Sequence, residues 1–323
     1  MAGQYSIGID LGGTNVKFAL LKDSKKVVDK RVLATKNYKT REGLISQLAL
    51  TVSDILKTNK IKKSGFIGLG IGVAGLVDFN RGFIHSLTNI KGWDKVSLGK
   101  ILSDKLKVEV SVDNDVNVVT LGEHKYGAGR GFDNLICLTL GTGVGAGLIL
   151  NGSLYRGPSF TAGEVGHIPI NVRGPKCNCG GRGCLERYVG NRYIIRMAKK
   201  LATGNRQSKM YKLVEGKLNM LTPKIVSEAA ILKDKAAILV WQKTGQYIGV
   251  ALSGLINLLN PEVIIIGGGV SLAGKPLFDS IRKTVFERAM PNPASKVKIV
   301  PAKLGEDAGV IGASILAASK KNK

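Results

Sequence analysis

Apolar residues along this chain gather in short runs that end at glycine-rich turns. Residues 5–11, YSIGIDL, predict a buried strand, and VKFALL at 16–21 and VVDKRVLA at 27–34 predict two more. Between residues 43 and 56 the apolar positions recur at helical spacing, and GFIGLGIGV at 65–73 again predicts a buried strand. Strands separated by helices in this way favour a sheet that is covered on both faces.

The opening pattern returns in the second half of the chain. Residues 135–150, LICLTLGTGVGAGLIL, predict a strand, a Gly-Thr turn and a strand, and they resemble residues 6–21, SIGIDLGGTNVKFALL. This internal similarity predicts two related α/β lobes, each with a glycine turn that faces a shared cleft. Further on, we expect an apolar helix over 245–259 that ends at Asn260-Pro261, because a residue that precedes proline disfavours the helical conformation.

The division between the lobes rests on pattern alone, since no low-complexity linker marks it. A buried helix is expected over 306–318, where acidic residues precede an apolar run. We expect a small lobe from residues 1–119 together with the C-terminal helix in 306–323, and a large lobe from residues 120–305.

The charge balance is unusual and widens the range of partners to consider. The chain carries 48 Lys and Arg against 23 Asp and Glu, a formal net charge of +25, which permits a polyanionic partner. The basic residues are nevertheless dispersed over several segments, and no basic platform with interleaved aromatic residues accompanies them. We therefore expect a solvated basic surface and no nucleic-acid partner.

Hydropathy and cysteine usage bear on the compartment. No run reaches the roughly 18 apolar residues that a membrane span needs, and the first residues lack the basic and apolar regions of a signal peptide. Three of the four cysteines crowd between residues 177 and 184, which suits a metal site in a reducing compartment better than a disulfide framework. The expectation is a cytoplasmic protein without a membrane partner.

Two turns carry the chemistry of an anion site. In Asp10-Leu-Gly-Gly-Thr-Asn15 a buried strand ends in an acid, two glycines let backbone N–H groups approach an anion, and a threonine adds a hydroxyl donor. Asp10 lies where it could hold a magnesium ion through water. The segment Leu140–Gly145 offers the same donors through Thr142 and Gly143. Either turn alone could be a plain hairpin, but two matched turns favour phosphate binding.

A third motif, Asn114-Asp115, follows a strand-like segment and opens an apparent helix. A carboxylate there could accept a proton from a substrate hydroxyl, as phosphoryl transfer requires, and Asn114 could bind neighbouring hydroxyls. Asp113 is a competing candidate for the base, and capping of the helix N-terminus is the alternative role for all three residues.

Further glycine-rich segments raise other candidates. Gly70–Gly75 matches a dinucleotide-binding fingerprint, but a turn and a strand follow it where that motif requires a helix. Gly269–Lys275 nearly matches a P-loop, but the next residue, Pro276, lacks the hydroxyl that would bind magnesium. Gly267–Gly269 could let a ribose or a flat ring lie against the backbone, with a tight strand-to-helix turn as the alternative.

The most specific motif combines an upstream histidine with the segment Cys177–Cys184, CNCGGRGC. One imidazole and three thiols form a tetrahedral zinc set, with a disulfide and a spare thiol as the alternative. Glu164 and Glu186 flank the cluster, so a zinc site would fix two carboxylates in the cleft as partners for sugar hydroxyls. The predicted metal ligands are His167, Cys177, Cys179 and Cys184.

Taken together, these motifs resemble the ROK family of sugar kinases and repressors. The resemblance implies an α/β, two-lobed actin-like (ribonuclease-H-like) ATPase fold with a structural zinc, and it covers nearly the whole chain. The pair GEVGH and CNCGGRGCLE is its most specific part. The matching segments are DLGGTNVK at 10–17, GVAGLVD at 72–78, NIKGW at 89–93, NDVNVVTLGE at 114–123, LGTGVGAG at 140–147, GEVGH at 163–167, CNCGGRGCLE at 177–186 and IIIGGG at 264–269.

The resemblance also implies a role for each matched residue. Asp115 would be the catalytic base, and His167 would contact both sugar and zinc. The implied sugar ligands are Gly75, Asn89, Asn114, Asp115, Glu164, His167 and Glu186. The implied ATP, phosphate and magnesium contacts are Asp10, Gly12, Gly13, Thr14, Lys17, Thr142, Gly143, Gly268 and Gly269.

Within the family, the early phosphate strand and the intact Asn-Asp pair favour a kinase over a repressor. We expect an ATP- and Mg²⁺-dependent glucokinase of glycolysis, with one zinc, that assembles as a homodimer or homotetramer. N-acetylmannosamine kinase and fructokinase are close alternatives. A polyphosphate-using glucokinase and a sugar-sensing transcriptional regulator are the others.

Overall fold

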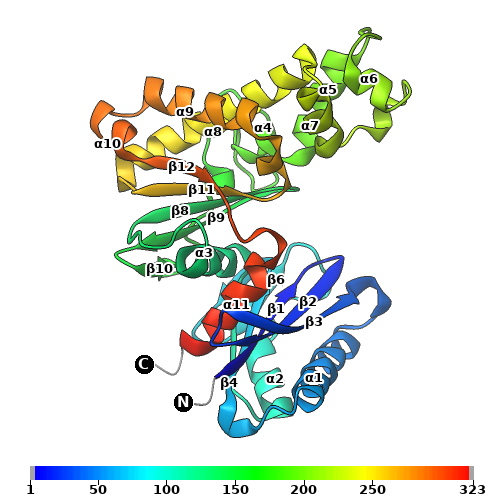
Figure 1. Ribbon diagram of the computed structural model, residues 1–323, viewed down its shortest axis with the longest axis vertical. Coiled ribbons are helices and arrows are strands. Elements are labelled where there is room, and N and C mark those ends of the chain that lie inside the picture. The colour runs from blue at the N-terminus through cyan, green and yellow to red at the C-terminus, as the bar shows by residue number, and fades with distance from the viewer. Residues whose placement is uncertain (1–3, 320–323) are drawn as a thin grey trace.

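Five strands of the first lobe form one sheet in the computed structural model, which describes residues 4–319 (Figure 1). Strand β1 pairs antiparallel with β2 and parallel with β4, and β4 pairs parallel with β7. In sheet order the strands are β3 (Lys26–Ala34), β2 (Asn15–Lys22), β1 (Tyr5–Leu11), β4 (Phe66–Val73) and β7 (Val110–Asn114).

The sheet of the second lobe has the same order and the same pattern of directions. Strand β8 pairs antiparallel with β9 and parallel with β11, and β11 pairs parallel with β12. The predicted internal similarity and two-lobed α/β fold are therefore confirmed. In sheet order the strands are β10 (Ser153–Tyr155), β9 (Val144–Leu150), β8 (Leu135–Leu140), β11 (Val263–Gly267) and β12 (Lys298–Pro301).

Helices cover both faces of each sheet, as expected from the alternation of strands and helices. Helices α1 (Arg41–Thr58) and α2 (Leu98–Leu106) cover the outer face of the first sheet, and α11 (Ala308–Ser319) covers its inner face. Helix α3 (Asp115–Tyr126) covers the inner face of the second sheet and packs on α11. Helices α8 (Lys235–Leu259) and α9 (Lys275–Arg288) cover its outer face.

Shorter elements complete the described part of the chain. A two-stranded sheet of β5 (Gly75–Asp78) and β6 (Phe83–Leu87) extends the first lobe. The remaining helices are α4 (Glu186–Val189), α5 (Asn191–Ala202), α6 (Lys209–Leu213), α7 (Pro223–Ile231) and α10 (Pro291–Lys296). The 3-10 turns are η1 (Thr35–Asn37), η2 (Lys63–Gly65), η3 (Val165–His167), η4 (Leu218–Met220), η5 (Gly269–Ala273) and η6 (Gly305–Asp307).

Glycine permits unusually close packing where the lobes meet. A Cβ atom on Gly70 of β4 would lie 1.7 Å from the carbonyl oxygen of Ala313 in α11, and one on Gly312 would lie 1.6 Å from that of Val118 in α3. No side chain fits at such distances, so α11 lies directly against both the first sheet and α3. This contact accounts for part of the glycine content of the chain.

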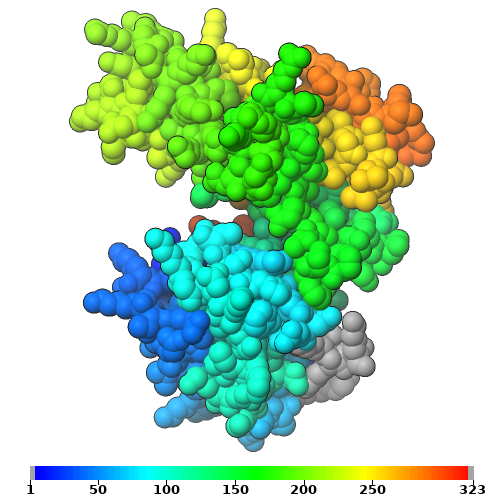
Figure 2. Space-filling view, turned by 180° about the vertical axis from the view of Figure 1, so that it is seen from behind, coloured from blue at the N-terminus to red at the C-terminus, as the bar shows by residue number. Residues whose placement is uncertain are grey.

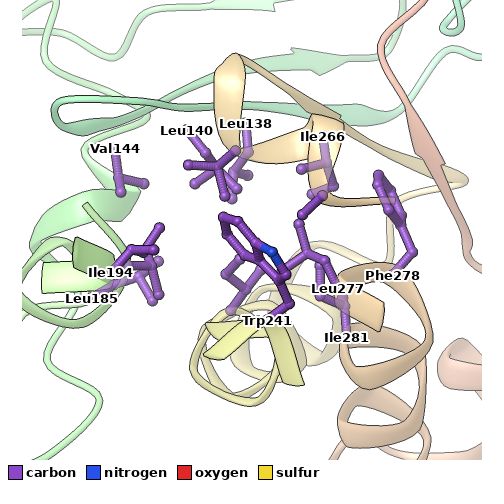
Figure 3. Close-up of a cluster of buried hydrophobic side chains, with 14 of the residues drawn as sticks. Leu138, Leu140, Val144, Leu185, Ile194, Trp241, Ile266, Leu277, Phe278 and Ile281 are labelled. Atoms are coloured by element: carbon purple, nitrogen blue, oxygen red, sulfur yellow. The ribbon is translucent and has the colours of Figure 1, made fainter. Parts of the chain in front are cut away.

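The core of the second lobe supports the strands that carry its glycine turn. Figure 3 shows the indole ring of Trp241, from α8, among Leu138, Leu140 and Ile266 of the sheet. Trp241 is fully buried. Replacing a buried aromatic residue by alanine typically costs about 3–5 kcal/mol. The β8–β9 turn therefore rests on a rigid apolar base.

Two predicted helices differ in extent from those observed. The helix expected over 245–259 begins ten residues earlier, at Lys235, because the Asp234 carboxylate accepts hydrogen bonds from the backbone N–H groups of Ala236 and Ala237. The helix expected over 306–318 begins at Ala308, after a 3-10 turn.

The expected lobe boundary, between residues 119 and 120, lies within α3, and the division into two domains stays a prediction. The end of the predicted C-terminal segment, residues 320–323, lies outside the described residues. Over residues 4–319, no helix is long and apolar enough to cross a membrane.

Candidate active site and metal centre

The candidate residues collect where the parallel strands of both sheets end. Asp10 lies near the carboxyl end of β1 and Asn114 at that of β7. In the second lobe, Gly141 follows β8 and Gly268 follows β11. Figure 2 shows the two lobes facing one another across a hollow. Ligands of open α/β sheets bind at the carboxyl ends of the strands, so this hollow is the candidate site.

The glycine turn of the first lobe is held in shape by its neighbours. The backbone N–H of Gly12 donates to the carbonyl of Asn15 at 3.0 Å, and the hydroxyl of Thr35 donates to the carbonyl of Gly12 at 2.8 Å. A Cβ on Gly13 would lie 2.8 Å from both the Cβ and the carbonyl oxygen of Asn89. The structure therefore brings Asn89 against this turn. Thr35, which the sequence analysis missed, shapes it.

Two carboxylates interact within the cleft. Burial raises the pKa of Asp10, and the charge of Lys17 partly offsets that effect. Burial also raises the pKa of Asp115 to about 6, and the nearby charge of Asp10 adds to the rise. Like charges disfavour joint ionisation, so a cation beside Asp10 would relieve both groups. The site thus offers a proton acceptor that titrates near neutral pH next to a potential cation ligand.

Asn114 caps helix α3, as the alternative interpretation of this motif allowed. Its side-chain oxygen accepts hydrogen bonds from the backbone N–H groups of Val116 at 2.8 Å and Asn117 at 3.2 Å. Its amide group donates to the carbonyl of Gly75 at 3.2 Å. The structure therefore joins Asn114 and Gly75, and Asn114 keeps one amide hydrogen for a ligand.

Asp113 is fully engaged by protein groups. Its side chain is 2% exposed, and one of its oxygens lies 2.7 Å from Nε and 2.6 Å from Nη2 of Arg156. The other oxygen accepts hydrogen bonds from the backbone N–H of Asn114 at 2.8 Å and from the side-chain amide of Asn117 at 2.9 Å. Protein groups thus face both oxygens of Asp113 and leave neither directed at a substrate hydroxyl, which favours Asp115 as the base.

The glycine turn of the second lobe lies against one of the predicted sugar ligands. The Glu186 carboxylate accepts a hydrogen bond from the backbone N–H of Val144 at 3.0 Å, and a Cβ on Gly143 would lie 2.7 Å from the same oxygen. The carbonyl of Gly141 accepts a hydrogen bond from the N–H of Asn191 at 2.9 Å. Glu186, a predicted sugar ligand, therefore contacts the predicted phosphate turn directly, and the sequence did not reveal this contact.

The loop after β11 lies beside the same turn. Gly268 has a φ of 80°, and a Cβ there would lie 2.3 Å from the carbonyl oxygen of Leu140. Gly269, in contrast, has open space where a Cβ would be. The backbone of this loop is therefore accessible to a flat ring or a ribose. Lys17, the remaining predicted phosphate contact, forms an ion pair with the exposed Glu306 at 3.1 Å.

The four predicted zinc ligands meet in one cluster. Their ligand atoms all lie within 4.8 Å of one another. The Sγ atoms of Cys179 and Cys184 are 3.7 Å apart, as are Sγ of Cys177 and Nδ1 of His167. Zinc–sulfur bonds of about 2.3 Å in a tetrahedron give edges of about 3.8 Å. The spacing therefore fits zinc, and all four cysteines are free thiols, unlike the disulfide alternative.

The Cys/His cluster leaves one edge of the His167 ring directed toward a predicted sugar ligand. Nε2 of His167 lies 3.9 Å from the carboxylate of Glu164, while Nδ1 faces the thiols. The carbonyl of Gly163 accepts a hydrogen bond from the N–H of Ala146 in β9 at 3.1 Å. Strand β9 and the cluster thus hold the segment that carries Glu164 and His167 from both ends.

Comparisons with known proteins agree with the fold and with these motifs. The sequence model of the ROK family matches residues 6–320. The chain is 38% identical to a glucokinase of Halalkalibacterium halodurans over 323 residues, which is 100% of this chain and 97% of the relative. A ROK family glucokinase from Streptomyces griseus, solved with glucose and AMPPNP, has a TM-score of 0.81 and 32% identity, and the match covers 98% of this chain and 99% of that one.

A regulator of the same family is also similar. It is a ROK family transcriptional regulator described as a homologue of the E. coli MLC protein, with a TM-score of 0.88 and 25% identity. The match covers 98% of this chain and 78% of the regulator. The fold is therefore shared by kinases and regulators.

The zinc content of the purified protein tests the assignment of this cluster. Protein purified without chelators should contain close to one zinc per chain, measured by elemental analysis, because four such ligands bind zinc tightly. Cys179→Ser should lower both the zinc content and the melting temperature. Cys137→Ala is the matched control, since Cys137 is buried in β8 outside the cluster, and it should keep its zinc. Metal-free protein as stable as a zinc-loaded sample would contradict the assignment.

Proposed function

This chain belongs to the ROK family, and we propose that it is an ATP-dependent glucokinase that converts D-glucose to glucose 6-phosphate. Similarity to glucokinases over the full chain supports a hexose kinase. The observation that carries the proposal is Asp115, a buried carboxylate whose pKa is raised to about 6 and which opens a helix between two phosphate-type turns. Its neighbour Asp113 is already occupied by Arg156.

In the proposed reaction the 6-hydroxyl oxygen of glucose bonds to the γ-phosphorus of ATP. The bond from that phosphorus to the bridging oxygen of ADP breaks, and the hydroxyl proton passes to the Asp115 carboxylate. A base with a pKa near the working pH is best suited to this transfer. Closure of the lobes would exclude water, so that ATP is not hydrolysed instead.

Residues of both lobes would hold the sugar. Glu164, His167 and Glu186 would accept or donate hydrogen bonds to its hydroxyls from the second lobe, and Asn114 would do so from the first. Gly75 and Asn89 would contribute weaker contacts. Zinc bound at the cluster would fix His167, so loss of the metal would also weaken sugar binding.

The two glycine turns would bind the phosphates. Thr14 with Gly12 and Gly13 would serve from the first lobe, and Thr142 with Gly143 from the second, through backbone N–H groups and hydroxyls. Asp10 would hold Mg²⁺, which when bound neutralises charge on the phosphates. Gly268 and Gly269 would lie along the adenosine. Lys17 would reach the phosphates only by leaving Glu306.

Two alternatives have specific observations in their favour. The net charge of +25 favours polyphosphate as the donor, and the similarity to a regulator favours a sugar sensor that binds glucose without turnover. Preference for N-acetylmannosamine or fructose is a third outcome, since small changes in a pocket can switch hexoses. The cytoplasmic location and a dimeric or tetrameric assembly stay predictions.

The base assignment predicts a clear contrast between two neighbouring acids. Asp115→Asn should keep the fold and bind glucose, measured by calorimetry, but lose at least about a hundredfold in kcat, because removal of a general base typically costs that much. Asp113→Asn should lower the melting temperature, because Arg156 loses its charged partner, and it should lower kcat less than Asp115→Asn does. The assignment is wrong if Asp113→Asn lowers kcat more than Asp115→Asn.

The pH profile offers an independent check. Asp115 accepts a proton only when ionised, and its pKa is raised to about 6. Because kcat/KM reports the pKa of the free enzyme, kcat/KM for glucose at subsaturating MgATP should be constant above about pH 7 and fall about tenfold per pH unit below about pH 6. A rate that stays level down to about pH 5 would contradict a base with this pKa.

The donor assignment predicts a weak dependence on salt. Dispersed surface charges are screened over about 8 Å at physiological ionic strength, so ATP-driven formation of glucose 6-phosphate should change only a few-fold between low and moderate salt. Polyphosphate alone should support little activity. A polyanion contacts many basic side chains at once, and its binding weakens steeply with salt. Turnover with polyphosphate at or above that with ATP, falling steeply with salt, would overturn the donor assignment.

A further inference from the structure

Arg156 forms a buried contact between the two lobes. It follows strand β10 of the second lobe, whereas its partner Asp113 belongs to β7 of the first. Both Nε and Nη2 of Arg156 contact one Asp113 oxygen, at 2.7 and 2.6 Å, and the two side chains are 18% and 2% exposed. The guanidinium carbon also lies 3.8 Å from the centre of the Phe79 ring, which follows β5. Three interactions therefore fix one guanidinium group.

On the side of the first lobe, this contact leads directly to the proposed base. The second oxygen of Asp113 accepts hydrogen bonds from the backbone N–H of Asn114 at 2.8 Å and from the side chain of Asn117 at 2.9 Å. Asn114 and Asn117 flank Asp115 at the start of α3. The position of Asp113 therefore sets where the helix, and with it the Asp115 carboxylate, begins.

On the side of the second lobe, the same residue starts the loop that carries the sugar ligands. The carbonyl of Arg156 accepts a hydrogen bond from the N–H of Ala162 at 3.0 Å, which closes the loop 156–162. The next residue, Gly163, is held on β9 and precedes Glu164. Arg156 therefore lies at the origin of the segment that ends at Glu164 and His167.

Stability alone does not account well for such a pair. Burying two charges costs hydration free energy, and their mutual attraction offsets only part of that cost. Apolar residues of similar volume often give a protein equal or greater stability. A planar guanidinium group that donates two hydrogen bonds and stacks on an aromatic ring does, however, fix the relative position of its partners. A lysine ammonium, which is a point charge, does not.

We propose that Arg156 is a positioning residue, which sets the proposed base Asp115 of the first lobe against the sugar ligands of the second. The proposal rests on the proposed glucokinase function. Misplacement of reacting groups by about 1 Å can cost up to a hundredfold in rate. Loss of the contact should therefore lower kcat even in fully folded protein.

The test compares four variants. Arg156→Gln removes the positive charge of the pair, and Arg156→Lys keeps that charge but loses the planar guanidinium group. The double variant Asp113→Asn/Arg156→Gln removes both charges. Arg282→Gln is the matched control. The guanidinium carbon of Arg282 lies 5.5 Å from the ring centre of Phe278, and Arg282 pairs with Asp279. Arg282 lies on α9, away from the cleft. Steady-state kinetics are measured well below the lowest melting temperature, with zinc content and thermal unfolding of each variant recorded.

We expect Arg156→Gln to lower kcat about tenfold to a hundredfold and to raise KM for glucose, with KM for MgATP little changed. Arg156→Lys should recover stability but not kcat. The double variant should recover stability, because no unpaired buried charge remains, yet stay at least about tenfold below the wild type in kcat. The control should match the wild type.

Recovery of wild-type kcat in the double variant would show a purely structural role and overturn the proposal, as would an unchanged kcat in Arg156→Gln. An assay of the wild type with a panel of hexoses, made first, distinguishes failure of the proposed glucokinase function from failure of the proposed role of Arg156. Absence of any sugar phosphorylation would overturn the proposed function and this inference with it. An active wild type with unaffected variants would overturn the inference alone.

Discussion

The packing of α3 against α11 is the contact on which the arrangement of the cleft depends. The two helices lie between the sheets, one on the inner face of each, and glycines at the contact remove the side chains that would hold them apart. A Cβ on Gly122 would lie 2.8 Å from the carbonyl oxygen of Ala308. Because α3 begins at Asp115 and the start of α11 lies against Asp10, the same contact places both carboxylates of the candidate site.

A second set of contacts joins the two ends of α3 to segments that connect or bridge the lobes. Glu123, fully buried near the end of α3, accepts hydrogen bonds from the backbone N–H groups of Lys303 and Leu304, at 3.0 and 2.8 Å to one of its oxygens. Those residues lie on the path from β12 to α11. At the opposite end of α3, Asp113 and Arg156 join the lobes again. The proposed base thus lies on a helix that is anchored at both ends.

The sequence was informative wherever function depends on residues that are close along the chain. The two glycine turns, the internal similarity and the four-ligand cluster are local patterns, and the structure has each of them in the predicted place. The choice between Asp113 and Asp115 was different, since adjacent acids look alike until their partners are known. Arg156 lies 43 residues from Asp113, and no periodicity or spacing indicates such a pair. Thr35 and Glu123 were missed for the same reason, and the early start of α8 depends on a cap that apolar periodicity does not reveal.

In the proposed function, the two lobes bring a base, a sugar and a phosphoryl donor together at Asp115. The most direct measurement is a crystal structure of the protein with glucose and a non-hydrolysable ATP analogue. We expect the sugar 6-hydroxyl within about 2.6–3.2 Å of the Asp115 carboxylate, with the terminal phosphate between the two glycine turns. A 6-hydroxyl that instead faces Asp10 or Glu186, with Asp115 remote from the sugar, would contradict the account.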